Sequence, residues 1–522
     1  MNTQRRLVLA TIAASLFLAA CSEPNGGDAN SSASGATAAA AIGVDRFLLF
    51  PDPIVLPDGS YETASNAYAD AYYRAIDPNN DKDTLDKWKL ANGIGSGGNE
   101  HLAVFRDVKD LGYGRRMTGR LNADGSVAFM VENYNVTAVP GNGYSSLNVE
   151  AAIVQDSKWH IGTNAIEWSA SPCTPEDPAD CKSNVKFAKY YNFSPTTGQR
   201  QLAVDLDGKG MKAMPGPCVT CHGGRGDPLT PADVSTGKPR FALVENSLSR
   251  KRGDTEGRLQ GLNVDSFEFS GRAGRQRGDQ EASLKDFNKW VLCTYPLPTA
   301  SALLEDQCRV AAGANEWQGT AAEIVKAWYG GPNMPNAAFA DNYVPAGWSA
   351  NAPLPGTSLT DKTLYQQVVA PYCRTCHAVR GTGDQSDIDF MTLAKFQGYA
   401  DRIKVNVFDR GNMPLALIVH QDFWDSSAPA TLAAYIDSVL GANTATAASG
   451  VTLQAGRSPT PDPTAWCAPA PTRSSPRPTA CSPRATAGRS CRARRAQRSR
   501  TQLHRSRHSS HRLRVNTPCN SP

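Results

Sequence analysis

The chain has 522 residues, of which 40% are hydrophobic and 8% are aromatic. This composition is typical of globular domains and excludes a fibrous or wholly disordered protein, and the length allows two or three domains. The net charge of +5 is unevenly distributed, because the segment after Ala455 has fourteen arginines, no lysine and one acid, a net charge of +13 that leaves −8 for the rest. The folded part is therefore acidic, and we expect no nucleic-acid partner.

The N-terminus has the pattern of an export signal followed by a linker. Two arginines precede the 14-residue apolar run Leu7–Ala20, which is too short to span a bilayer, and small residues lead to Cys21. This pattern resembles a bacterial lipoprotein signal; the alternative is an ordinary signal peptide with a chance cysteine. The resemblance implies that residues 1–20 are removed, that Cys21 is lipidated and, because Ser22 is not aspartate, that the anchor lies in the outer membrane. Residues 21–43, rich in Gly, Ser and Ala, predict a flexible tether.

Residues 44–210 predict a mixed domain rich in β-structure. Asp124-Gly125 separates two runs with β character, and Asp-Gly pairs tolerate the positive φ of tight hairpin turns. Asp207-Gly208 follows a further run and predicts a second turn of this kind. The segment Glu62–Ala75, rich in Ala and Tyr, predicts a helix.

A glycine-rich segment, Gly93–Gly98, formally satisfies the G-x-G-x-x-G pattern of dinucleotide-binding turns. That pattern requires a preceding strand, whereas Thr84–Ala91 has helical character, and nucleotide cofactors are not expected outside the cytoplasm. We therefore interpret the segment as a glycine-rich loop.

Two segments have the form C-x-x-C-H: Cys218–His222 in the region 211–352 and Cys373–His377 in the region 353–443. Two thiols at this spacing reach the vinyl groups on one edge of a porphyrin, and the adjacent histidine binds the iron. A thioredoxin-like pair would need a βα context, and zinc is disfavoured because the two pairs are more than 150 residues apart and each has its own histidine. We expect two covalent haems c, held by Cys218, Cys221, His222, Cys373, Cys376 and His377.

The region 353–443 predicts a small helical domain. Apolar residues within Leu364–Val368 predict a first helix that Pro371 ends. Ser427 is a candidate cap for a last helix with apolar residues at helical spacing, and Gly441 ends that helix.

A Met-Pro turn at Met413 lies 36 residues after His377. The order of opening helix, C-x-x-C-H, helix, Met-Pro turn and closing helix closely resembles a class I cytochrome c domain. The resemblance implies that Met413 is the sixth ligand of this iron, and a thioether ligand raises the reduction potential. His420 is the competing ligand, and we expect it at the surface.

The first motif has a related turn, since Gly331–Ala337 shares Asn-Met-Pro with Arg410–Ala416. Thr320 and Glu323 predict a capping box for the helix before it. We expect Met334 to bind the first iron, in a haem domain with a long insertion, because 112 residues separate it from the motif histidine. The competing ligands are Met211, Met214 and His160.

Four further cysteines before the tail predict disulfide loops. Cys173 lies close in sequence to Cys181, and Cys293 to Cys308, and an oxidising compartment favours closing each pair.

The tail 444–522 predicts disorder, because it has few long aliphatic residues to bury. Arginine without lysine is typical of a GC-rich gene translated out of frame, and we interpret the tail as such a product. Binding to an anionic membrane is the alternative.

Two haems in more than 400 residues is a low density, which excludes a wire-like multihaem cytochrome. We expect a multidomain α+β protein that transfers electrons between donor and acceptor proteins and is held at the membrane by its lipid. The alternatives are a dihaem peroxidase- or oxygenase-like enzyme with an open first iron, and a cytochrome subunit whose acidic body docks on a basic periplasmic dehydrogenase.

Overall fold

The computed structural model describes residues 66–137, 145–172, 186–207, 211–224, 253–295, 319–380, 388–411 and 413–445, with the backbone of two short strands between residues 229 and 241. The predicted signal segment, Cys21, the tether and the tail beyond residue 445 lie outside these residues, as do Cys173, Cys181 and Cys308. Within the described part of the chain, no helix has both the length and the hydropathy needed to cross a bilayer.

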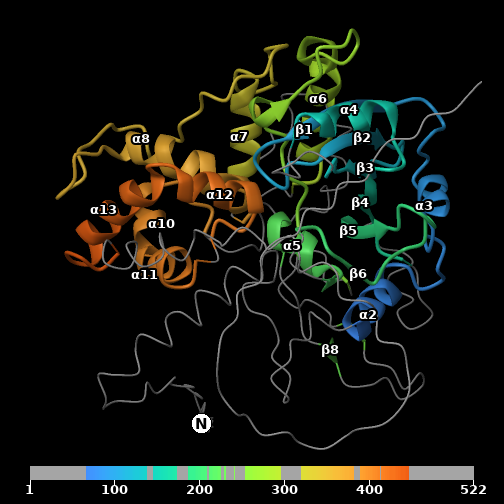
Figure 1. Ribbon diagram of the computed structural model, residues 1–522, viewed down its shortest axis with the longest axis horizontal. Coiled ribbons are helices and arrows are strands. Elements are labelled where there is room, and N and C mark those ends of the chain that lie inside the picture. Colours follow the sequence, from blue (N-terminus) through green and yellow to red (C-terminus); the bar gives the residue numbers. More distant parts are fainter. Residues whose placement is uncertain are drawn as a thin grey trace, which may run out of the picture. The chain divides into compact units, whose positions relative to one another are not determined.

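The described residues form a mixed α and β structure around a six-stranded antiparallel sheet with the order β10-β1-β2-β3-β4-β5 (Figure 1). The predicted mixed character with much β-structure is confirmed. The edge strand β10 comes from the region 211–352, so this sheet includes chain on both sides of residue 210. The strands are β1 Glu100–Asp107, β2 Gly114–Leu121, β3 Val127–Tyr134, β4 His160–Ala170, β5 Lys186–Phe193 and β10 Phe267–Glu268.

The β2–β3 hairpin has the turn that the sequence predicts. Leu121 pairs with Val127, and Gly125 has φ 77°, which glycine adopts without steric cost. The carboxylate of Asp124 accepts hydrogen bonds from the amide and the hydroxyl of Ser126. The Asp-Gly pair therefore closes this hairpin, as predicted.

Two helices pack on opposite faces of β2. A Cβ on Gly119 would lie 2.6 Å from the rings of Phe129 and Phe287, and Phe287 belongs to α6 (Arg277–Leu292). A Cβ on Gly114 would lie 1.8 Å from the carbonyl oxygen of Asn148 in α4 (Leu147–Val154). Because alternate residues of a strand face opposite sides, the two glycines admit one helix to each face.

The predicted early helices are present. Helix α2 (Asn66–Ile76) buries its tyrosines, and α3 (Leu85–Ala91) begins at Thr84, whose hydroxyl accepts from the Lys87 amide. Turns follow from Gly93 to Gly98, which confirms the predicted loop. The strands β6 (Ala203–Val204) and β7 (Lys212–Ala213) pair on either side of the predicted Asp207-Gly208 turn, whose residues 208–210 lie outside the described residues.

The remaining elements of the first two regions are short apart from α6. They are α5 Gly216–His222, β8 Leu229–Thr230, β9 Arg240–Phe241, the 3-10 turn η3 Val264–Ser266 and α7 Thr320–Trp328.

The region after residue 353 is helical within the described residues. Its core surrounds Trp348, which is fully buried, packs edge-on or tilted against Tyr365 and Phe396, and donates from Nε1 to the carbonyl oxygen of Phe390 at 2.8 Å. The helices are α8 Asp361–Leu364, the π-helical segment η5 Tyr365–Cys373, α9 Arg374–His377, α10 Leu393–Gly398, α11 Ala400–Lys404, the π-helical segment η6 Val405–Asp409, α12 Leu417–Asp425 and α13 Ala428–Leu440.

The prediction that Pro371 ends the first helix is wrong. The chain stays helical from Asp361 to His377, with Pro371 inside η5. A proline lacks an amide hydrogen and its ring collides with the preceding turn of an α-helix, but the wider π-helical turn accommodates it. The second C-x-x-C-H motif therefore lies at the C-terminal end of one continuous helical segment.

Two predicted caps differ from the structure. Thr320 does not form a capping box, because Gly319 is the N-cap of α7 and the Thr320 hydroxyl donates to Asp389 Oδ2 at 2.5 Å. Helix α13 follows Ser427 and ends at Gly441 as predicted, but the Ser427 side chain makes no capping bond; its carbonyl oxygen accepts from Thr431. The Thr320 hydroxyl therefore bonds to a residue distant in sequence and does not cap its own helix.

One hydrophobic cluster joins the sheet to the first motif. It contains Tyr72, Tyr190, Val219 and Met334, all buried, and Cys218 packs against it. The cluster includes residues on both sides of residue 210, so the sheet and the first motif share a core in the described structure.

Candidate haem-binding site

The first motif occupies α5, which starts with the Pro-rich turn that the sequence shows. Pro217 lies in the first helical turn, where no amide hydrogen is needed, and Gly223 ends the helix with φ 82°. Val219 and Thr220 are buried, whereas Cys218, Cys221 and His222 are partly exposed. Residues three apart share a helix face, so α5 presents its two cysteines together.

The ring of His222 is held by a backbone carbonyl. Its Nδ1 donates to the carbonyl oxygen of Arg258 at 2.8 Å, and the Arg258 amide donates to the carbonyl oxygen of His222 at 2.8 Å. A carbonyl oxygen only accepts, so Nδ1 carries the hydrogen and Nε2 carries the lone pair. Burial lowers the pKa of His222 to about 4, which keeps the ring neutral at neutral pH. A neutral imidazole with a free Nε2 lone pair is the form that binds iron.

The second motif has the same arrangement from different elements. His377 Nδ1 donates to the carbonyl oxygen of Ile388 at 2.8 Å, and its ring stacks on Phe390 with centroids 4.3 Å apart. Burial lowers the pKa of His377 to about 4. Both histidines are therefore neutral, oriented, and protonated on the nitrogen that faces the protein, which is the arrangement typical of metal-binding histidines.

All four motif cysteines are free thiols. Burial raises the pKa of Cys218 and of Cys373 to about 12. Both thiols are protonated in the folded chain, and a protonated thiol is a poor nucleophile. Cys293, in contrast, is disulfide-bonded, as predicted. Its predicted partner, Cys308, lies outside the described residues.

The two predicted methionine ligands lie in the cores that carry their motifs. Met334 is 2% exposed in the cluster that packs on Cys218, and Met413 is partly buried in the cluster that packs on Cys373. Met334 has φ 49°, a left-handed conformation that few non-glycine residues adopt.

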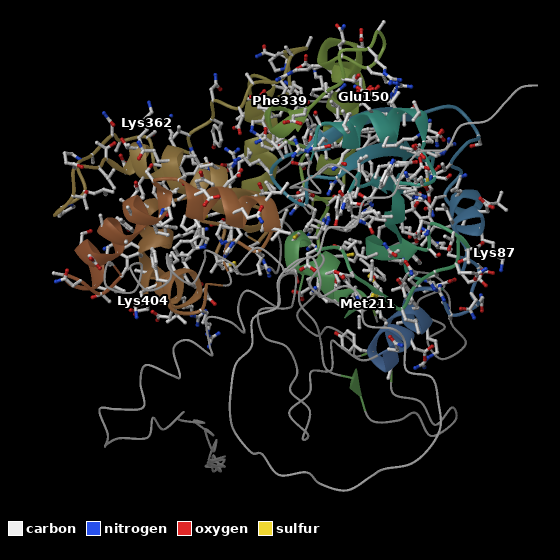
Figure 2. All side chains as sticks on the ribbon, in the orientation of Figure 1. Lys87, Glu150, Met211, Phe339, Lys362 and Lys404 are labelled. Carbon is white, nitrogen blue, oxygen red and sulfur yellow. The ribbon has the colours of Figure 1, made fainter. Side chains whose placement is uncertain are left out.

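The competing ligands have different environments. Met211 is 61% exposed (Figure 2), and His160 Nε2 lies 3.2 Å from the hydroxyl of Thr163 in β4. Met214 is fully buried in the same cluster as Met334. Burial alone therefore leaves Met214 as the rival of Met334 at the first motif.

The prediction that His420 lies at the surface is wrong. Its side chain is buried, because Trp424 lies one turn further along α12 and covers it. Trp424 Nε1 donates to His420 Nε2 at 3.1 Å. The same Nε2 also lies 3.1 Å from the carbonyl oxygen of Gly411, so protein partners already occupy this nitrogen, which favours Met413 as the ligand.

Two buried polar groups near the first motif lack protein partners that a bound haem would supply. The Tyr190 ring centroid lies 5.4 Å from that of His222, and its hydroxyl has no hydrogen-bond partner among the described residues. Arg258 is 4% exposed, its Nε also lacks a partner there, and its guanidinium forms no ion pair with a described residue. A buried guanidinium is costly without an anion, and a porphyrin carries two propionates. The residues present therefore fit haem at the first motif.

Charged groups lie near the first motif. Arg115 forms a partly exposed ion pair with Asp110, and both interact electrostatically with His222. Burial, followed by the nearby Asp110 carboxylate, raises the pKa of Asp107 to about 7. Within the described residues, no group of three or more His, Cys, Asp or Glu side chains is arranged to bind a metal ion. Haem does not need such a group, because the porphyrin supplies four of the iron ligands.

Sequence reasoning missed Arg258, Ile388 and Tyr190. The carbonyl of Arg258 lies 36 residues after His222, and no local pattern marks a backbone acceptor at that distance. The Tyr190 side chain reaches the motif only through the sheet. Searches against protein-family models, curated proteins and solved structures found no match to this chain.

Proposed function

We propose that the protein is an exported dihaem c-type cytochrome lipoprotein that transfers electrons between partner proteins. In this proposal the folded chain has a β-rich part at 44–210, a haem-binding part at 211–352 and a class I-like cytochrome c part at 353–443. The observation that carries the proposal is the shared geometry of His222 and His377. Each donates Nδ1–H to a carbonyl oxygen beside a pair of free thiols.

The geometry matters because it fixes the metal-binding nitrogen. A histidine that donates Nδ1–H to the backbone keeps Nε2 available, and its ring cannot rotate without losing the hydrogen bond. Both histidines form this bond, although the accepting carbonyl lies 36 residues after His222 in one motif and 11 residues after His377 in the other. Local sequence similarity between the motifs does not by itself produce such agreement.

Each part of the chain has a defined task with haem bound. Haem supplies a one-electron couple at iron. Cys218 and Cys221 would hold one haem and Cys373 and Cys376 the other, while Arg258 would balance a propionate of the first. Met334 and Met413 would occupy the sixth positions, which closes both irons to substrates and favours electron transfer over catalysis.

The test is to produce the full chain with its maturation machinery and measure haem content, intact mass and spectrum. We expect two haems c per chain by pyridine haemochrome, both low-spin with methionine charge-transfer bands. Pairwise replacement of Cys218 and Cys221, or of Cys373 and Cys376, by alanine leaves one haem. Colourless protein, or pigment that acid-acetone extracts completely, contradicts the proposal.

The enzyme alternative differs at the first iron. Met413→Ala should open the second iron, and Met334→Ala the first, so each variant alone should gain a high-spin haem that binds cyanide. If unmodified protein already binds cyanide and Met334→Ala changes nothing, the first iron is open and the peroxidase- or oxygenase-like function is favoured.

A further inference from the structure

The two C-x-x-C-H motifs lie against each other in the described structure. Helices α5 and α9 are in contact, and Cys221 and Cys376 lie next to each other at this contact. These are the second cysteines of the two motifs. Each motif therefore turns one of its haem-attachment positions toward the other.

The contact continues past the cysteines. A Cβ on Gly223 would lie 2.6 Å from Cγ2 of Val379, so a residue with a side chain does not fit at this approach. Arg380 Nη1 donates to the carbonyl oxygen of Gly224 at 3.2 Å. The segments that follow the two motifs are therefore in close contact with each other.

Gln260 joins the two motifs directly. Its Nε2 donates to the carbonyl oxygen of Cys221 and to that of Thr375, the second at 3.2 Å. A side-chain amide has two N–H donors, so one glutamine satisfies both acceptors. Gln260 lies two residues after Arg258, the residue whose carbonyl orients His222.

The loop between β1 and β2 covers the same junction. Leu111 packs with Cys221 of the first motif and with Leu417 of α12. The amide of Ile418 donates to the carbonyl oxygen of Asp110 at 3.2 Å. The sheet therefore contacts both haem-binding parts and holds them in one arrangement.

We propose that the two haems form an electronically coupled pair, joined where Cys221 and Cys376 meet, and that electrons pass between them inside the chain. This rests on the proposed function, because it requires a haem on each motif. Each sulfur would be bonded to a side-chain carbon of its own porphyrin. The packing of α5 on α9, together with the Gln260 bonds to both motifs, would therefore hold the two haems close together.

The transfer step balances as a one-electron exchange. With haem bound, the group held by Cys218, Cys221 and His222 would give up one electron as the group held by Cys373, Cys376 and His377 gains it, or the reverse, and no covalent bond or proton would move. A one-electron donor protein would supply the electron, and a one-electron acceptor protein would remove it.

The test is circular dichroism of the oxidised full-length holoprotein in the Soret region. Two haem transitions in close contact couple and give a pair of bands of opposite sign, which the sum of the spectra of the two single-haem variants does not reproduce. Those variants carry alanine at Cys218 and Cys221, or at Cys373 and Cys376. Haem content by pyridine haemochrome is measured on the same samples.

The two proposals fail differently. Two haems per chain with a spectrum equal to the sum of the single-haem spectra overturns the coupled pair and leaves the cytochrome function intact. Protein without covalent haem overturns both.

Gln260→Ala tests the positioning of the pair. We expect the paired bands to lose at least half their amplitude while both haems remain attached, because the backbone bridge is lost. Gln397→Ala, which changes an exposed glutamine on α10, is the matched control and should leave the bands unchanged. Full amplitude in Gln260→Ala, at unchanged haem content, contradicts the role of Gln260.

Discussion

The two motif regions reach the same histidine geometry in different surroundings. The first motif lies in a core shared with a β-sheet, beside buried tyrosines and the charged groups Arg115 and Arg258. The second lies in a helical core of aromatic residues, with Phe390 stacked on its histidine. The comparison teaches that this histidine geometry needs one short helix and one carbonyl acceptor, which unrelated packing can supply.

The two surroundings differ in the charge that they place near each motif. A buried cation stabilises the reduced, less positive state of a nearby haem, whereas an aromatic wall excludes water without adding charge. Most of the substitutions proposed here change a side chain in one of the two regions. The exception is the Asp341–Arg374 ion pair, which joins the two regions.

The largest effect is expected from emptying either core. Trp348→Ala in the core around the second motif and Phe287→Ala in the core of the first each remove a fully buried aromatic side chain, and each should lower the free energy of unfolding by about 3–5 kcal/mol. Because α5 and α9 are in contact, both variants should shift one shared urea transition. Two separate transitions, each sensitive to one variant only, would show that the regions unfold independently.

A buried ion pair joins the regions and should have the next largest effect. Asp341, which follows α7, pairs with Arg374 inside the second motif, and the two side chains are 14% and 7% exposed. Asp341→Asn leaves a buried guanidinium without its carboxylate and should cost about 3 kcal/mol of unfolding free energy, measured in urea.

The control for this pair is Asp409→Asn. Its partner is Lys404, on the surface of the second region (Figure 2), and both side chains are about one quarter to one third exposed, at 34% and 25%. Surface pairs contribute little, so the change should stay within about 0.5 kcal/mol. Equal effects of the two substitutions would contradict the importance of the Asp341–Arg374 pair.

We expect the stability of the first region to depend on pH through Glu167, a buried residue of strand β4. Burial would raise the pKa of Glu167, but the ammonium groups of Lys82 and Lys189 outweigh burial and lower it to about 2. The folded pKa lies below the usual 4.5, so the stabilisation is complete above pH 4.5 and is lost as the pH falls toward 2. The full shift corresponds to about 3 kcal/mol.

The measurement compares wild type with Glu167→Gln by urea unfolding between neutral pH and pH 2.5. The difference in unfolding free energy between them should shrink as the pH falls, because glutamine does not titrate. Asp86→Asn, at a carboxylate that is 95% exposed, should give no such change. A constant difference between wild type and Glu167→Gln across this range would contradict the predicted role of Glu167.

The predictions that succeeded used local signals. Asp124-Gly125 fixes its hairpin through backbone conformation, and Gly441 marks a helix end by chemistry that acts within one turn. The predictions that failed involve distant partners. Thr320 donates to Asp389 instead of capping its own helix, and His420 is buried under Trp424.

The candidate site divides in the same way. The cysteines and histidines are visible as motifs, but the Arg258 carbonyl, the Gln260 bridge and the contact of Cys221 with Cys376 depend on tertiary packing. None of these has a sequence pattern that distinguishes it from any other arginine, glutamine or cysteine. The sequence therefore indicates the candidate haem-binding groups and not how the two motifs meet.

The smallest effect is expected from the charge that distinguishes the first region. Arg258→Met removes a buried cation beside His222 and keeps most of the side-chain volume, so the fold should survive because no described ion pair is broken. Losing positive charge favours ferric iron. The reduction potential of the first haem should fall by an amount on the order of 1 kcal/mol, or about 40 mV, as measured by spectroelectrochemical titration.

The matched control is Arg402→Met, which removes an exposed arginine on α11 in the second region. Solvent screens an exposed charge, so neither potential should change measurably. The two haems can be told apart by titrating the single-haem variants in parallel. If Arg258→Met lowers both potentials equally, or neither, then Arg258 does not distinguish the first haem from the second, and the contrast between a charged site and an aromatic one has no consequence for their potentials.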